Sequence, residues 1–271
     1  MSLGHVAIIG FGAIAQDLVA ILASQPQGAP KRISVLVRQG RIAQTRAALG
    51  RDDVMVTSDL DEILSARPDV VAECASHAAV RQFGPRVLAA GVDLVVASVG
   101  ALADPAVKAA LEAAARKAGV QCVVPAGAIG GIDALGAARL SGLRSVIYTG
   151  RKPPLAWAGT PAETLVDLAR LTQECVFFEG PAREAAQSYP KNANVAATLA
   201  LAGLGMEDTQ VRLIADPATT ENIHEFVVTS EALDFSVRLA GKPSVRNPKT
   251  SRSTVYSIAR AVLNRRAAID I

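Results

Sequence analysis

The chain has 271 residues, of which 50% are hydrophobic and only 4% aromatic, and its formal net charge is +3 at pH 7. This length and apolar fraction are sufficient for one large or two modest cores, built mainly from Ala, Val, Leu and Ile. The basic residues are scattered along the chain, which argues against nucleic-acid binding. The composition instead favours a mildly cationic site for a small anionic molecule.

Three cysteines, Cys74, Cys122 and Cys175, lie far apart and form no C-x-x-C pair. We therefore expect reduced thiols rather than a disulfide framework. No apolar stretch approaches the ~20 residues of a membrane span, and residues 1–4 contain no signal peptide. These features predict a cytoplasmic protein with no membrane partner, and no cluster of metal ligands is evident in the sequence.

A glycine-rich stretch near the N-terminus joins a predicted strand to a predicted helix. Val6–Ile9 is an apolar run without alternation, which is typical of a strand buried on both faces. A G-x-G-x-x-A fingerprint follows at once and opens a helix whose free N–H groups favour a pyrophosphate. This context favours dinucleotide binding over a purely structural glycine turn. We expect cofactor contacts from Gly10, Gly12, Ala13 and Ile14.

Strand-like runs alternate with amphipathic or Ala-rich stretches through the first half of the chain. We predict strands over Val6–Ile9, Ile33–Val37, Val54–Thr57, Val70–Cys74, Leu94–Ala97 and Gln121–Val124. Helices are expected over Ala13–Ala23, Gln39–Leu49, Asp59–Ala66, Val80–Ala90 and Pro105–Ala118. Such alternation predicts an α/β fold whose first part, residues 1–125, is a Rossmann domain with a doubly wound parallel sheet.

The composition changes after a glycine-rich segment at residues 126–131. Strands are then predicted in succession, over Ser145–Thr149, Cys175–Glu179, Gln210–Ala215, His224–Ser230 and Asp234–Leu239. Helices are predicted over Asp133–Leu140, Ala193–Gly203 and Thr254–Leu263. This order indicates a smaller α+β substrate domain over residues 126–250 with a mostly antiparallel sheet. We expect residues 251–271 to form a C-terminal helix that packs back on the first domain.

Two groups of polar residues follow strands of the predicted Rossmann domain, at the edge where open α/β sheets bind ligands. NAD-specific domains usually carry an acidic residue after the second strand, but this chain has Arg38 and Arg41. We therefore expect NADP to be accepted and NAD not to be excluded, although two solvated arginines are the alternative. Ser76 and His77 follow the fourth strand and are expected near the nicotinamide, although His77 could instead cap a helix.

Three polar segments of the second domain are candidates for substrate chemistry. His224 ends a loop rich in hydroxyl groups, and because histidine titrates near neutral pH it is a candidate acid/base, the alternative being an ordinary sheet histidine. Lys191 and Asn192 precede one predicted helix, and Lys249 and Thr250 precede another. Each pair could bind a substrate carboxylate at a helix N-terminus or could belong to a simple N-cap segment.

The sequence resembles the L-aspartate dehydrogenases along its whole length, without a large insertion. The matching stretches are Gly10-Phe11-Gly12-Ala13-Ile14-Ala15, Pro125-Ala126-Gly127-Ala128-Ile129-Gly130-Gly131, Tyr189-Pro190-Lys191-Asn192-Ala193-Asn194-Val195-Ala196, Asp216-Pro217 with Glu221-Asn222 and His224, and Asn247-Pro248-Lys249-Thr250-Ser251. The first is shared by many oxidoreductases, whereas the segments around Lys191 and Lys249 are far more diagnostic.

This resemblance implies NAD- or NADP-dependent oxidative deamination of L-aspartate to iminoaspartate, or the reverse reductive amination of oxaloacetate with ammonia. It places the catalytic histidine at His224 and NAD contacts at Ala128 and Asn194. It further implies a homodimer, in which the second domain also dimerises, and a product that can enter pyridine nucleotide biosynthesis. The alternatives are a related dehydrogenase or imine reductase acting on another small dicarboxylate, or a cofactor-sensing protein without turnover.

Overall fold

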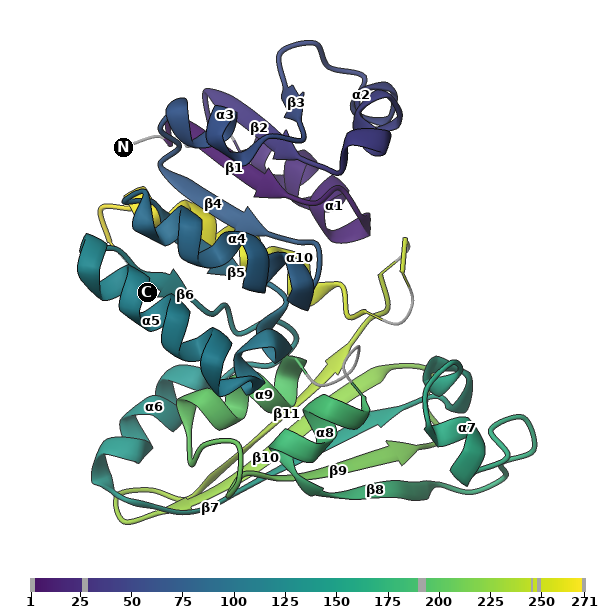
Figure 1. Ribbon diagram of the computed structural model, residues 1–271. Helices are drawn as coiled ribbons and strands as arrows, with labels where there is room; N and C mark the ends of the chain where they lie inside the picture. The colour runs from purple at the N-terminus through teal and green to yellow at the C-terminus, as the bar shows by residue number, and fades with distance from the viewer. Residues whose placement is uncertain (1–2, 26–28, 190–193, 245, 248–249, 270–271) are drawn as a thin grey trace. The chain divides into compact units, whose positions relative to one another are not determined.

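The computed structural model describes residues 3–25, 29–189, 194–244, 246–247 and 250–269. The chain divides into two compact units, and the colours in Figure 1 follow the residue number through both of them. The first comprises residues 1–125 together with 255–271, and the second comprises residues 126–254. Within the described residues, no helix is long and apolar enough to cross a membrane.

The first unit contains a six-stranded parallel sheet with the order β3-β2-β1-β4-β5-β6 (Figure 1). Its strands are β1 (His5–Ile9), β2 (Arg32–Leu36), β3 (Met55–Thr57), β4 (Val70–Glu73), β5 (Asp93–Val96) and β6 (Cys122–Val123). This strand order confirms the predicted Rossmann-like fold. The direction of winding reverses between β1 and β4, and ligands of such sheets bind at the carboxyl ends of the strands at this point.

The helices of the first unit are α1 (Ala13–Ala23), α2 (Ile42–Leu49), α3 (Leu60–Ser65), α4 (His77–Ala89), α5 (Pro105–Ala118) and α10 (Ser253–Leu263), which starts two residues before the unit boundary. Although α10 is distant in sequence, its Val255, Ile258 and Val262 lie in the same buried cluster as Val6 and Leu18. Their spacing of three and four residues places them on one helix face, which is the face that packs against the first unit.

The second unit contains a five-stranded sheet with the order β11-β10-β7-β9-β8. Its strands are β7 (Leu143–Lys152), β8 (Cys175–Pro181), β9 (Gln210–Ala215), β10 (Asn222–Ser230) and β11 (Phe235–Gly241). Neighbouring strands are antiparallel except for the parallel pair β7 and β9. The prediction of a mostly antiparallel sheet is therefore confirmed, with β7 at its centre.

Helices cover one face of this sheet. These are α6 (Ile132–Ser141), α8 (Ala182–Ser188) and α9 (Asn194–Ala202), whereas the short α7 (Ala162–Leu165) lies in the connection between β7 and β8 (Figure 1). The covered face carries Phe226 and Tyr148, which are fully buried, and the opposite face carries Val227 and Ile147, which are about two-fifths exposed. This alternation follows from the period of two along a strand. The sequence pattern predicts neither α7 nor α8.

Strand β7 is twice as long as the predicted strand over residues 145–149. Its ten residues extend through Gly150 and Arg151 to Lys152, which have low strand propensity and gave no signal in the sequence. The extension pairs with β10 on one side and with β9 on the other. Pairing on both sides thus overrides local propensity, and it adds three residues at the C-terminal end of the predicted strand.

Candidate functional site

The two glycines of the fingerprint have different surroundings. Gly10 has φ of +91°, and a Cβ atom there would lie only 2.7 Å from Cβ of Ala75 and 2.9 Å from its Cα. Gly10 is therefore required by both the turn and the packing. Gly12 has φ of −82°, and no described atom lies within 4 Å of the position of a Cβ. Packing does not require a glycine at this position, so the open space is available to a ligand.

Helix α1 starts directly after this open space and fits an anionic group. Gly12 is its N-cap without a side-chain cap, and the first turn contains no acidic residue. The first N–H groups of a helix have no partner within the helix, and the positive end of the helix dipole lies beside them. Ala15 is fully buried, which lets the helix lie close to β1. These features fit the pyrophosphate of a dinucleotide.

The side chain of Glu73 forms hydrogen bonds with the loops that follow β4 and β5. Its side chain is 1% exposed, and its Oε1 accepts hydrogen bonds from the backbone N–H groups of Ala75 (2.7 Å) and Ser76 (2.8 Å). Ser98 donates its hydroxyl to Oε1 and its backbone N–H to Oε2, both at 3.0 Å. Burial raises the pKa of Glu73, and the four donors oppose this rise. The carboxyl group therefore shapes two loops at the ligand-binding edge.

Ser76 and Arg38 lie at the same edge of the first sheet. Ser76 Oγ accepts a hydrogen bond from Ala79 N at 3.2 Å, so Ser76 caps α4, which begins at His77. Arg38 is exposed and follows β2, directly before a 3-10 turn over Gln39–Arg41. The N–H of Gly10 donates to Leu36 O of β2 at 2.8 Å, which holds the fingerprint loop beside the end of β2. Cofactor contacts of Ser76 and Arg38 stay predictions.

His224 lies on the covered face of the second sheet and is 4% exposed. It stands directly opposite Gly150 of β7, and its Nδ1 lies 2.8 Å from the hydroxyl oxygen of Tyr148. The two rings are nearly parallel, at 14°, with centroids 6.1 Å apart. A Cβ atom on Gly150 would lie 2.7 Å from the Tyr148 hydroxyl. The missing side chain of Gly150 therefore provides the space in which Tyr148 reaches His224.

The surroundings of His224 change its protonation. Burial and the positive charge of Lys152 lower the pKa of His224 to about 3. Burial also raises the pKa of Tyr148, so its hydroxyl group stays protonated. At neutral pH the pair is therefore a neutral imidazole hydrogen-bonded to a neutral phenol. The expectation that His224 titrates near neutral pH used the pKa of a solvated histidine, and burial beside Lys152 moves the pKa below that value.

A buried cation lies on the same face of β7 as Tyr148 and Gly150. Lys152 is 5% exposed, and its Nζ lies 5.1 Å from the centroid of the buried Trp157 ring. On the opposite face, Arg151 pairs with Asp216 at 2.7 Å and with Glu174. Arg151 and Lys152, which are neighbours on β7, thus point to different sides of the sheet. The charge of Lys152 lies on the side of His224, where it would favour an anionic ligand.

Three of the remaining predicted residues of the second unit are described by the structure, Ala128, Asn194 and Thr250. Ala128 is 8% exposed, and Asn194 is the first residue of α9, where its backbone oxygen accepts a hydrogen bond from Thr198 Oγ1 at 2.9 Å. Thr250 Oγ1 accepts a hydrogen bond from Asn247 Nδ2 at 3.0 Å. Lys191, Asn192 and Lys249 lie outside the described residues. The roles of all six residues stay predictions.

Four residues of these surroundings are not among the site residues predicted from the sequence: Tyr148, Gly150, Lys152 and Glu73. Tyr148 is one of three tyrosines in a chain poor in aromatic residues, which is a weak signal for a special environment. Glu73 ends an otherwise apolar run, and a carboxylate in a strand buried on both faces is unusual. Gly150 and Lys152 gave no signal, because their importance depends on pairing with a strand more than 70 residues away.

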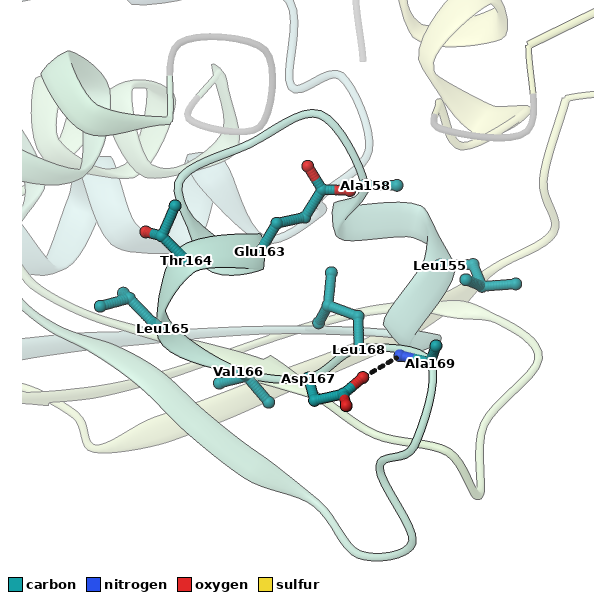
Figure 2. Close-up of a pocket in the computed structure, with 9 residues that line it drawn as sticks. All are labelled: Leu155, Ala158, Glu163, Thr164, Leu165, Val166, Asp167, Leu168 and Ala169. Carbon is teal, nitrogen blue, oxygen red and sulfur yellow. Dashed lines mark hydrogen bonds between the residues drawn. The ribbon is translucent and has the colours of Figure 1, made fainter.

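A surface hollow in the segment that connects β7 to β8 does not contain any predicted site residue (Figure 2). Its wall includes the carboxylates of Glu163 and Asp167, and none of its nine lining residues is cationic. Asp167 accepts a hydrogen bond from the backbone N–H of Ala169 at 3.2 Å. Two carboxylates would repel an anionic substrate, so this hollow does not match the chemistry indicated by His224 and Lys152.

Comparisons with known families and structures cover both units. A model of the C-terminal region of aspartate dehydrogenase matches residues 133–265, and a model of the NAD-binding domain of homoserine dehydrogenase matches residues 10–125. The structure of aspartate dehydrogenase from Thermotoga maritima is similar over 100% of both chains, with a TM-score of 0.78 and 26% identity. A dihydrodipicolinate reductase from a Paenisporosarcina species shares the fold, with a TM-score of 0.54 and 16% identity.

Two curated relatives are similar over nearly the whole chain. An L-aspartate dehydrogenase from Cupriavidus necator is 47% identical over 270 residues, and one from Pseudomonas aeruginosa is 48% identical over 270 residues. Each match covers 98% of this chain and 99% of the relative. With an NAD(P)-binding first unit and this degree of identity over its full length, the chain belongs to the L-aspartate dehydrogenase family.

Proposed function

We propose that the protein catalyses the NAD(P)-dependent oxidative deamination of L-aspartate to iminoaspartate, and the reverse amination of oxaloacetate, with His224 as the acid/base. The observation that carries this proposal is the buried, neutral imidazole of His224, which is held at Nδ1 by Tyr148. A neutral imidazole is a proton acceptor, and an anchored ring presents its other nitrogen in a defined direction. The family of the chain supports the choice of substrate.

The first unit would bind the cofactor through its backbone. The open space at Gly12 and the first N–H groups of α1, at Ala13 and Ile14, suit the pyrophosphate. Arg38 suits a 2′-phosphate or the adenine ring, while Ser76 and the second unit's Ala128 and Asn194 are proposed as further contacts. When bound, the nicotinamide ring takes up the hydride that leaves Cα of aspartate.

His224 would move the protons of this reaction. The substrate amine must be neutral before the hydride leaves, because its lone pair forms the new carbon–nitrogen double bond. Nε2 of His224 takes the proton from the substrate ammonium group and passes it to solvent. The neutral ring can then take a proton from the water that attacks the imine carbon, and ammonia and oxaloacetate result.

The second unit would also neutralise the charge of a dicarboxylate. Lys152 supplies a buried positive charge on the face of His224, and Lys191, Asn192, Lys249 and Thr250 are proposed to bind the two carboxylates. A dicarboxylate beside His224 brings negative charge that opposes the effect of Lys152. Its binding would therefore raise the pKa of His224 and increase its ability to accept the amine proton.

Association into a homodimer is a further part of this proposal. Ile147 and Val227 stand opposite each other on the face of the second sheet that points away from α6, α8 and α9, and they are 40% and 43% exposed. Apolar side chains in this position suit contact with a second copy of the chain. Sedimentation at several protein concentrations should show a dimer, and a monomer at all concentrations would contradict this part of the proposal.

The function is tested by the absorbance of the reduced nicotinamide. L-Aspartate with NAD or NADP should produce this absorbance, whereas L-glutamate, L-malate and D-aspartate should give little. His224→Ala should lower kcat by roughly 10²–10⁴-fold, the usual contribution of a positioned acid/base, without weakening cofactor binding. Turnover of another dicarboxylate in preference to L-aspartate would replace the proposed substrate. A near-normal kcat for the variant would remove His224 from the mechanism.

A further inference from the structure

Three residues of the second sheet form a unit around the imidazole of His224. Tyr148 and Gly150 come from β7, and His224 comes from β10. Gly150 stands directly opposite His224, and Tyr148 is two residues away on the same face, so that its side chain crosses the strand pair diagonally. The Tyr148 hydroxyl lies 2.8 Å from Nδ1 of His224 and 2.7 Å from the position of a Cβ on Gly150.

We propose that Tyr148 is the positioning residue of His224, that its hydroxyl oxygen accepts a hydrogen bond from the N–H group of Nδ1, and that Gly150 provides the space for this contact. The lone pair of Nε2 is then available to the substrate amine. The proposal rests on the proposed role of His224 in proton transfer. It adds which nitrogen acts, which side chain fixes the ring, and why β7 carries a glycine opposite the histidine.

The chemistry of the hydroxyl group supports the acceptor role. A phenol oxygen can either donate a hydrogen bond to Nδ1 or accept one from it. If Tyr148 donated, the proton of the neutral ring would lie on Nε2, and that atom could not take a proton from the amine. If Tyr148 accepts, Nε2 is free to be protonated, and the contact persists in the imidazolium form because Nδ1 keeps its proton.

A phenol also differs from the carboxylate that orients histidine in many enzymes. A carboxylate would stabilise the imidazolium and raise the pKa of the histidine. Tyr148 is neutral, because burial raises the pKa of its hydroxyl group. It can therefore fix the ring direction while leaving the imidazole uncharged, beside the cationic Lys152 of the same strand. This arrangement suits a base that must be unprotonated when the substrate ammonium arrives.

Nuclear magnetic resonance of ¹⁵N-labelled histidine tests the tautomer directly. In the wild-type protein, the signals of His224 should show a protonated Nδ1 and an unprotonated Nε2, and His224→Ala identifies them among the three histidines. In Tyr148→Phe, the acceptor is lost and the Nε2-protonated form, which a solvated histidine side chain favours, should increase. A wild-type His224 protonated at Nε2, or equal tautomer populations in both proteins, would overturn the proposal.

Kinetics provides the second readout. Tyr148→Phe should lower kcat by about 10-fold, the value of one hydrogen bond, with little change in the KM for the cofactor. Tyr256→Phe is the matched control, because Tyr256 is half-exposed on α10 of the first unit and its hydroxyl loss should leave kcat unchanged. A normal kcat in Tyr148→Phe would show that the hydroxyl is not needed to position His224. A loss of kcat in His224→Ala but not in Tyr148→Phe would leave the proposed function intact and remove this inference.

Gly150→Ala separates positioning from general packing. Its new Cβ would displace the Tyr148 hydroxyl, so we expect a loss of kcat similar to that of Tyr148→Phe. In a protein that already carries Tyr148→Phe the hydroxyl is absent, so adding Gly150→Ala should cause little further loss of kcat. The Cβ also approaches Leu213 Cδ2 and Tyr148 Cζ, both at 3.2 Å, so a lower melting temperature can occur in both backgrounds. Independent, additive losses of kcat would contradict the coupling of Gly150 to Tyr148.

Discussion

The two units build their sites from residues at very different distances along the chain. In the first unit, Gly10, Gly12 and the start of α1 are neighbours in sequence, and the local backbone creates the site. In the second unit, His224 and Tyr148 are 76 residues apart and meet only because β7 and β10 pair in one register. A site of the first kind depends on local conformation, and a site of the second kind depends on the whole sheet.

The two sites also differ in the hydrogen-bond partners of their buried polar side chains. Glu73 accepts four hydrogen bonds from groups on two loops, so the first unit satisfies a buried carboxyl group mostly with backbone donors. The second unit satisfies a buried imidazole with one side-chain hydroxyl. His5 makes a similar contact, since its Nε2 lies 2.8 Å from Ser34 Oγ, but it lies at the start of β1. That is the edge opposite the carboxyl ends, so location rather than the hydrogen bond separates a structural histidine from a candidate acid/base.

The largest expected effect of a local change is at Gly12. Gly12→Val should reduce cofactor affinity by at least about 100-fold, because the new side chain occupies the space proposed for the pyrophosphate. The fold should persist, since φ of −82° is accessible to valine. Calorimetric titration with NADH and thermal unfolding would measure both quantities.

Gly10→Ala is the matched control for this prediction. It should destabilise the first unit, because φ is +91° and Ala75 is in the way. An unchanged cofactor titration in folded Gly12→Val would show that the open space at the start of α1 is not the pyrophosphate site.

These contrasts explain which parts of the molecule the sequence predicts well. The Rossmann sheet, α1 and α5 follow from local patterns of glycines, apolar runs and helix propensity, and they were predicted almost to the residue. The mixed sheet was predicted as mostly antiparallel, but the parallel pairing of β7 with β9 and the full length of β7 were not. Pairing between distant strands decides both features, and no local signal encodes it.

The same reasoning applies to the candidate site. His224 stands out as a rare titratable residue beside a polar loop, whereas Gly150 and Lys152 lie beyond the predicted end of their strand. The protonation of His224 also could not be predicted, because the pKa depends on burial and on the charge of a residue in another strand. Thus the sequence predicts His224 as a candidate acid/base, but it does not predict the electrostatic environment of His224.

Glu73→Gln should have the next largest effect, on the stability of the first unit. The side-chain amide of glutamine would place an N–H group opposite one of the four donors that now bind the carboxyl oxygens. A buried donor would then lack an acceptor, which should lower the free energy of unfolding by about 3 kcal/mol. Chemical denaturation measures this loss. Glu62→Gln is the control, because Glu62 is exposed on α3 and should change stability by less than about 1 kcal/mol. Equal effects at the two positions would show that Glu73 does not organise the loops.

Arg38→Asp should change cofactor selection without affecting the second unit. The loss of a charge-assisted contact with a 2′-phosphate should weaken NADP binding by about 1.5–3 kcal/mol. NAD binding should change much less, because NAD has no phosphate at this position. KM values for both cofactors measure the difference. Equal changes for NAD and NADP would identify Arg38 as a solvated surface residue.

The smallest expected effect tests the environment of His224 through the pH dependence of stability. The pKa of His224 is lowered from 6.5 to about 3 in the folded protein, so between these values only the unfolded chain binds the proton. The contribution of His224 to the free energy of unfolding is therefore greatest above pH 6.5, and it decreases as the pH falls. Between pH 7 and 5.5 the decrease should be about 1.3 kcal/mol, and it should be absent in His224→Gln. His5, whose pKa burial also lowers, is present in both proteins, so its contribution cancels. If chemical denaturation showed the same decrease in both proteins, then His224 would titrate in the folded state as a solvated histidine does. The second unit would in that case resemble the first, with its site open to water rather than enclosed by the sheet and its helices.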